Sequence, residues 1–126
     1  MRIGKIKING REHLLCFSAR VVRSCSERYG SIDKIPDALS KGTEAEIMDE
    51  SFWLLAEMMT AGDRYAKLEG LENEKPLSVE ELYDTCGMED IANMKTRIFE
   101  TVSNGNERMV EVEADKGKNV ETAQLT

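Results

Sequence analysis

The sequence predicts a mainly α-helical protein: an N-terminal β-hairpin, then a small bundle of about four helices, then a flexible C-terminal tail. Two short apolar runs flank Asn9-Gly10, the favoured two-residue turn of a β-hairpin. Apolar residues then recur at helical spacing as far as Val102. A chain of 126 residues suits one domain, expected over residues 1–105, followed by a disordered acidic tail over residues 106–126.

The hairpin is expected over residues 2–17. A type I′ turn fixes the register of its strands and predicts these pairs: Ile8 with Arg11, Lys7 with Glu12, Ile6 with His13, and Gly4 with Leu15. Two strands alone are marginally stable, so the hairpin must pack on a helix or join another sheet edge, such as that of a second copy. We therefore predict that the hairpin supports self-association through Ile6, Ile8, Asn9 and Gly10.

The first helix is expected over residues 18–29. Ser18 is a suitable N-terminal cap, and Gly30 supplies the stop. The following segment, residues 31–42, contains Pro36 and scattered small residues. We expect this segment to be mostly loop, with a loop that contains one helical turn as the alternative.

The strongest helical pattern predicts a central helix over residues 44–69. Thr43 and Glu46 have the spacing of a capping box, and acidic residues crowd the first turns, where the helix dipole favours negative charge. Gly62 marks either a close helix crossing or a short break, and the pattern does not choose between them. Gly70 is expected to end the helix.

Two further helices are expected before the tail. Ser78 and Glu81 form a full capping box, which predicts a short helix over residues 78–86. A last helix is expected over residues 90–103, because apolar residues recur there at helical spacing. We expect Asn104-Gly105 to end it.

The charge balance and the apolar pattern exclude several classes of partner. The net charge is −7, from 24 acidic and 17 basic residues, whereas nucleic-acid-binding proteins present a basic face. No apolar stretch approaches the ~18 residues that span a bilayer. Lys5 and Lys7 interrupt the apolar core that a signal peptide would need. We expect a soluble cytoplasmic protein with no nucleic-acid partner and no membrane partner.

Catalytic and metal-binding patterns are weak. His13 is the only histidine, and Cys16, Cys25 and Cys86 lack the paired spacing typical of zinc sites. Positions 13 and 16 of a strand also point to opposite faces. The sequence contains no Gly-x-Ser-x-Gly elbow, Walker loop or Gly-x-Gly-x-x-Gly turn. We therefore expect free thiols, no metal, no cofactor and no enzymatic activity.

Partner binding is expected on the central helix, around these residues: Phe52, Trp53, Met58, Met59 and Tyr65. Methionine-rich surfaces adapt to different apolar partners, because the thioether side chain is flexible and polarizable. Ordinary core packing of the same residues is the alternative, and the pattern favours it.

Four segments together resemble a known family. They are Ile6-Lys7-Ile8-Asn9-Gly10, Arg28-Tyr29-Gly30-Ser31, Ser51-Phe52-Trp53-Leu54-Leu55-Ala56-Glu57-Met58-Met59 with Gly62 and Tyr65 after it, and Leu77-Ser78-Val79-Glu80-Glu81-Leu82. In this arrangement, which covers residues 3–103, the chain resembles the tail assembly chaperones of long-tailed bacteriophages and prophages. The resemblance rests on the order of elements and the apolar pattern.

This resemblance implies a non-catalytic helical protein that binds the long tape measure protein and keeps it soluble until tail tube subunits polymerise around it. It also implies a homo-oligomer that works in the cytoplasm of the bacterial host and is absent from the mature virion. The family often makes a longer product by ribosomal frameshifting, and Gly117-Lys118-Asn119 is a candidate slip site. A minor longer protein in mass spectra of the expressed gene would support slippage there.

Other classes of protein stay open at this point. A virion structural component, such as a head–tail connector subunit, would remain in purified particles. A small prophage regulatory protein would bind DNA through Arg20, Arg23 and Arg28, with a strong dependence on salt. An enzyme is the weakest alternative, and a turnover lost on changing His13 or Cys16 would be its sign.

Overall fold

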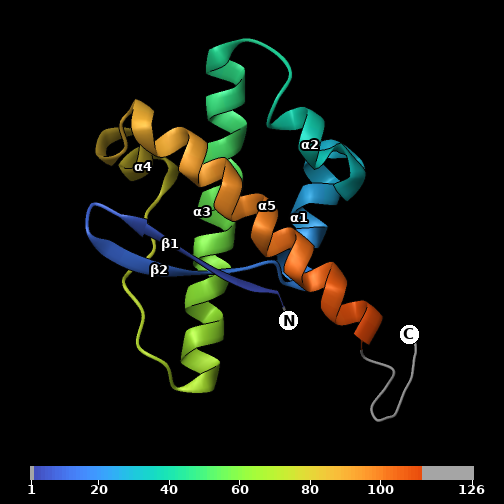
Figure 1. Cartoon of the computed structure of the whole chain (residues 1–126), viewed down its shortest axis with the longest axis vertical. Helices are drawn as coiled ribbons and strands as arrows, with labels where there is room; N and C mark the ends of the chain where they lie inside the picture. Colours follow the sequence, from blue (N-terminus) through green and yellow to red (C-terminus); the bar gives the residue numbers. More distant parts are fainter. Residues whose placement is uncertain (1, 112–126) are drawn as a thin grey trace.

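The long helix α3, Glu44–Glu69, is the axis around which the other elements pack (Figure 1). The structure, a computed structural model, describes residues 2–111, and only the helical backbone over residues 104–111. The elements in chain order are β1 Ile3–Ile8, β2 Arg11–Cys16, α1 Ala19–Tyr29, the 3-10 turn η1 Ile32–Lys34, α2 Ile35–Ala38, α3, α4 Val79–Thr85 and α5 Met88–Glu111. The predicted class, mainly α with an N-terminal hairpin, is confirmed.

The hairpin has the predicted register, from Ile8 opposite Arg11 to Gly4 opposite Leu15. Asn9 and Gly10 have φ values of 53° and 78°, as a type I′ turn requires at both central residues. Strand β2 packs on α3 and strand β1 packs on α5. The hairpin is therefore held by the helices of its own chain.

Two glycines allow this close packing of strands on helices. A Cβ atom on Gly62 of α3 would lie 2.0 Å from the carbonyl oxygen of Leu14, and one on Gly4 would lie 1.9 Å from Oγ1 of Thr101 in α5. Helix α3 runs through Gly62 without a break. Of the two alternatives for Gly62, the close approach is correct, although the neighbour is a strand rather than a helix.

The segment between α1 and α3 contains more helix than the sequence predicts. Helix α1 begins after Ser18, whose hydroxyl accepts a hydrogen bond from the backbone of Val21, and ends at Gly30. The turn η1 and the single turn of α2 follow at once. Ile35 and Leu39 are buried, and burying these side chains stabilises the helical turn. The prediction of a mostly irregular loop is therefore wrong.

Helix α5 is longer than predicted at both ends. It begins at Met88, two residues before the predicted start, and continues through Gly105 to Glu111. A glycine costs only about 1 kcal/mol inside a helix, so Asn104-Gly105 permits a stop without imposing one. The predicted boundaries at residues 103 and 105 are wrong, and residues 106–111 belong to the helix. The rest of the predicted tail, with Gly117-Lys118-Asn119, lies outside the described residues.

The core lies between α3, the hairpin and the apolar faces of α1, α4 and α5. Among its most deeply buried side chains are Leu15, Leu54, Leu55, Leu82, Met94 and Ile98. The two predicted capping boxes are confirmed, at Thr43 with Glu46 and at Ser78 with Glu81. Within residues 2–111, no helix combines the length and the apolar character that a membrane crossing requires.

Candidate functional site

An apolar groove lies between the N-terminal part of α3, the end of α4 and the start of α5. Its volume is about 600 Å³. Six side chains form its apolar wall: Ile47, Met48, Phe52, Tyr83, Met88 and Ile91. Glu44, Cys86, Gly87 and Lys95 complete the lining. We call this feature the α3–α5 groove.

An aromatic pair joins α3 to α4 at the base of the groove. The rings of Phe52 and Tyr83 meet edge to face, with centroids 4.4 Å apart and an interplanar angle of 88°. The hydroxyl of Tyr83 donates a hydrogen bond to Asp49. Burial and this hydrogen bond raise the pKa of Tyr83 to about 12. Tyr83 is therefore an uncharged part of the wall, held against Phe52.

The short connection between α4 and α5 sets the lip of the groove. Cys86 ends α4 in an extended conformation, and the backbone N–H of Gly87 donates to Oδ2 of Asp90 at 2.8 Å. Met88 follows with 85% of its surface exposed. Burial raises the pKa of the Cys86 thiol, so the thiol stays neutral and serves as an apolar lining group.

Carboxylates surround the groove. Glu44 lies in the lining itself, while Asp49 and Asp90 bond directly to lining residues. Glu80 contributes a negative charge close to Tyr83. Lys95 is the cation of the lining. The groove thus combines its apolar wall with a mostly acidic rim.

The structure places three of the predicted binding residues in the core. Met58 and Met59 are 0% exposed and Phe52 is 2% exposed. The expectation that the two methionines form an open binding face is therefore wrong, because α3 is surrounded by the hairpin and other helices at this level. Only Phe52 reaches the groove, where it contributes to the wall.

Trp53 is half-buried but already has partners within the chain. Its ring lies 4.4 Å from the guanidinium of Arg28 and meets Tyr29 edge to face at 5.8 Å. Arg28 also forms two hydrogen bonds with Glu50, at 2.7 and 3.2 Å, and these bonds lower the pKa of the Glu50 carboxyl. The cluster joins α1 to α3, which accounts for Trp53 without an external partner.

Tyr65 lies at a second recess, far along α3 from the α3–α5 groove. This recess has a volume of about 340 Å³ and is lined by Arg20, Arg64 and Leu68 among others. Leu68 is 83% exposed. Of the predicted binding residues, Tyr65 is therefore the one that borders an open apolar surface away from the groove.

The hairpin residues predicted for self-association divide into two groups. Ile6 and Ile8 are buried in the core of their own chain, so the prediction that they contact another copy is wrong. Asn9 and Gly10 are exposed at the turn. The expectation of self-association itself stays a prediction.

Of the groove residues, the sequence predicts only Phe52 as a binding residue, and it misses the rest of the apolar wall: Ile47, Met48, Tyr83, Met88 and Ile91. The predicted start of the last helix at residue 90 leaves Met88 outside that helix. A usable signal exists in the sequence, since Met88, Ile91 and Lys95 have the three- and four-residue spacing of one helical face. That face lies beside the stripe that carries Met94 and Ile98 into the core.

The described residues of the α3–α5 groove offer an apolar wall and several carboxylates. No group of three or more His, Cys, Asp or Glu side chains is placed to hold a metal ion within the part of the chain that the structure describes. Cys16, Cys25 and Cys86 are free thiols, as predicted. No protein-family model, curated protein or solved structure matches the chain.

Proposed function

We propose that the protein is a non-catalytic tail assembly chaperone whose α3–α5 groove binds amphipathic helical segments of a tape measure protein. The observation that carries the proposal is the groove itself, with an exposed methionine at its lip and an apolar wall. Grooves of this kind bind the apolar face of a helix. The resemblance of the chain to tail assembly chaperones supplies the identity of the partner.

The composition of the groove suits successive segments of one long partner. Met48 and Met88 stand in its lining, and flexible thioethers repack around different apolar side chains at little cost. The acidic rim favours a helix whose apolar face is flanked by lysine or arginine. The net charge of −7 disfavours nonspecific aggregation of the chaperone.

The proposal is tested by placing a charge on the lip of the groove. Met88→Asp should weaken capture of the tape measure protein about tenfold, because a carboxylate replaces an apolar side chain that the bound partner would bury. The probe is a tape measure protein, co-expressed and co-purified with the chain. Since Met88 is almost fully exposed, the circular-dichroism signal should not change.

The matched control is Leu68→Asp, which alters an equally exposed apolar residue at the other recess. Capture should be unaffected by this change. Equal capture by Met88→Asp and the unaltered chain would contradict the proposal. Loss of capture with Leu68→Asp alone would move the binding surface to Tyr65.

The head–tail connector alternative is tested in purified phage particles. A chaperone should be present in the lysate of producing cells and absent from finished particles by mass spectrometry. A fixed number of copies in each particle would instead identify a structural component.

A further inference from the structure

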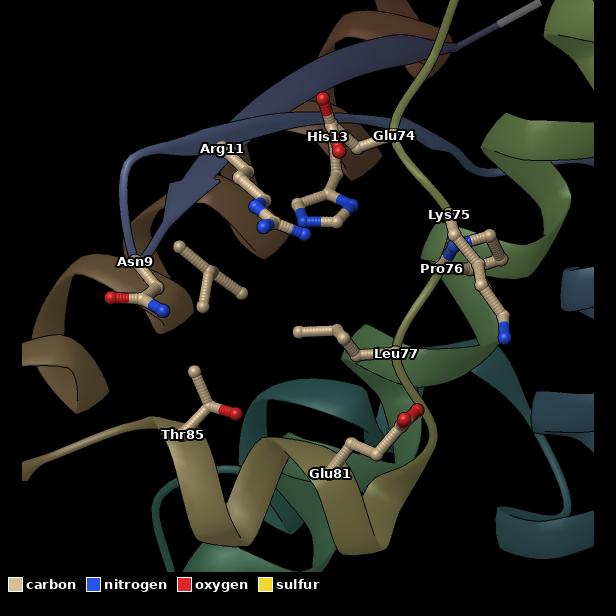
Figure 2. Close-up of a pocket in the computed structure, with 10 residues that line it drawn as sticks. Asn9, Arg11, His13, Glu74, Lys75, Pro76, Leu77, Glu81 and Thr85 are labelled. Carbon is tan, nitrogen blue, oxygen red and sulfur yellow. The ribbon is translucent and has the colours of Figure 1, made fainter.

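A second pocket, polar and separate from the α3–α5 groove, lies between the hairpin turn, the connector before α4, and α4 itself (Figure 2). Its volume is about 300 Å³, at the lower end of the range for small-molecule sites. Ile8, Pro76 and Leu77 give it an apolar side, and Arg11 and His13 give it a polar side. The pocket therefore offers both an apolar surface and hydrogen-bonding groups.

His13 is buried at this pocket with an unsatisfied ring nitrogen. The residue is 2% exposed, and its Nδ1 atom has no hydrogen-bond partner among the described residues. Buried polar atoms are nearly always hydrogen-bonded, so an unpaired nitrogen beside a cavity points to a missing partner. Burial is the main cause that lowers the pKa of His13, and the positive charge of Arg11 adds to it. The imidazole is therefore neutral when the pocket is empty.

Arg11 is the cation nearest to this imidazole. It precedes His13 by two residues on β2, so both side chains lie on the same face of the strand. Figure 2 shows its guanidinium beside the imidazole. No carboxylate among the described residues lies within ion-pairing distance of Arg11.

The other charged groups around the pocket come from the connector and from α4. Glu74, in the connector, raises the pKa of His13 through its negative charge and through a backbone hydrogen bond, and each of these effects is larger than the lowering by Arg11. The carboxylate of Glu81 accepts the backbone N–H of Ser78 at 2.9 Å, and Figure 2 shows the ammonium of Lys75 directed away from the imidazole. Arg11 is thus the cation beside His13, and it has no ion pair among the described residues.

We propose that this pocket binds a small organic carboxylate, with its anionic head between Arg11 and His13 and its short apolar body over Ile8, Pro76 and Leu77. A carboxylate accepts hydrogen bonds from guanidinium and imidazolium groups, and such charge-assisted bonds are the stronger ones. The bound anion stabilises protonated His13, so binding takes up a proton near neutral pH and tightens as the pH falls. The site is independent of the function proposed for the groove.

The test uses the full-length chain and three small probes: butyrate, its neutral isostere butyramide, and inorganic phosphate. Because His13 is the only histidine, its imidazole signals in NMR spectra report the site directly. Butyrate should shift these signals saturably and raise the pKa of His13. Its affinity should increase severalfold between pH 7.5 and pH 6. Butyramide should bind at least tenfold more weakly, because it lacks the charge.

Two exposed arginines provide the variant and its control. Arg11→Gln should reduce the affinity for butyrate about tenfold, whereas Arg23→Gln, on α1, should leave it unchanged. Tighter binding of phosphate than of butyrate would reassign the site to inorganic anions and overturn the proposal. An absence of saturable shifts with butyrate, or equal binding of butyramide, would also overturn it.

Discussion

A missing side chain at Gly62 allows the long helix to meet the hairpin. A Cβ atom there would lie 2.0 Å from the carbonyl oxygen of Leu14 and 2.5 Å from its carbonyl carbon. Backbone atoms of a packed strand cannot move aside as a flexible side chain can. The glycine is therefore a requirement of the packing between α3 and β2.

We predict that Gly62→Ala destabilises the protein by about 2 kcal/mol or more, despite a gain of about 1 kcal/mol in helix propensity. Urea unfolding followed by circular dichroism measures the change. Gly87→Ala is the control, because its new Cβ would meet only the flexible carboxylate of Glu89, at 3.0 Å. Equal stability of the two variants would contradict the close approach of Leu14 to α3.

His13 makes stability depend on pH in a window of its own. Its pKa in the folded chain lies below the ordinary value of 6.5, chiefly because of burial. The unfolded chain therefore binds more protons, and the free energy of unfolding falls as the pH drops from about 7 to about 5. Most carboxyl groups titrate below this window. The loss of stability there is assigned to one residue.

We expect urea midpoints to decrease over this pH range in the unaltered chain and to stay nearly constant in His13→Asn. Asparagine keeps a polar group at a similar position but does not titrate. Its midpoint at pH 7 is the control for any direct effect on folding. A slope that persists in the variant would show that another group titrates in this window.

Among the elements, the connector between α3 and α4 is hydrogen-bonded to the outer edge of the hairpin. Oδ1 of Asn73 accepts the backbone N–H of Leu14 at 2.9 Å, and its amide donates to Asp63 of α3 at 3.3 Å. Asp63 in turn pairs with Lys67 at 2.9 Å. The Asn73 side chain thus provides a hydrogen-bond acceptor for an outward N–H group of β2 and links this strand to α3.

Asn73→Ala removes this link and should lower the free energy of unfolding by about 1 kcal/mol, the usual net value of one hydrogen bond. It should also speed hydrogen exchange at the Leu14 amide. Asn93→Ala is the control, since Asn93 is exposed on α5 and should change stability by less than about 0.5 kcal/mol. Unchanged hydrogen exchange at Leu14 in the Asn73 variant would contradict the hydrogen bond between Leu14 and Asn73.

At the scale of the whole molecule, the free edge of β1 is the part of the hairpin still open to another copy. Ile8 and Arg11 flank the turn as a hydrogen-bonded pair, so the N–H groups of Lys5 and Lys7 point outward. Exposed strand edges pair readily with other strands, and edge lysines limit this. Pairing across this edge is therefore the form of self-association that fits the buried positions of Ile6 and Ile8.

We predict that Lys7→Pro shifts any oligomer toward monomer in sedimentation velocity, because proline removes an outward N–H group without disturbing the core. Lys7→Thr removes the same charge and keeps the N–H group, so it should leave the oligomer intact. An oligomer that is unaffected by Lys7→Pro would use a surface other than the β1 edge.

Local sequence signals were enough to predict the hairpin register, both capping boxes and the bounds of α3. Each depends on residues only a few positions apart, such as Asn9 with Gly10 or Thr43 with Glu46, and on short-range hydrogen bonds. The same reasoning was less successful for the end of α5. A glycine permits both continuation and a stop, and local residues do not decide between them.

The tertiary structure alone decided which apolar residues are core and which are surface. Met58 and Met88 have the same side chain, yet one is fully buried and the other is almost fully exposed. Helical spacing defines an apolar face but not the element that covers it. The α3–α5 groove unites Met48 with Met88, and the polar pocket unites His13 with Leu77. Neither site exists until packing brings these distant segments together.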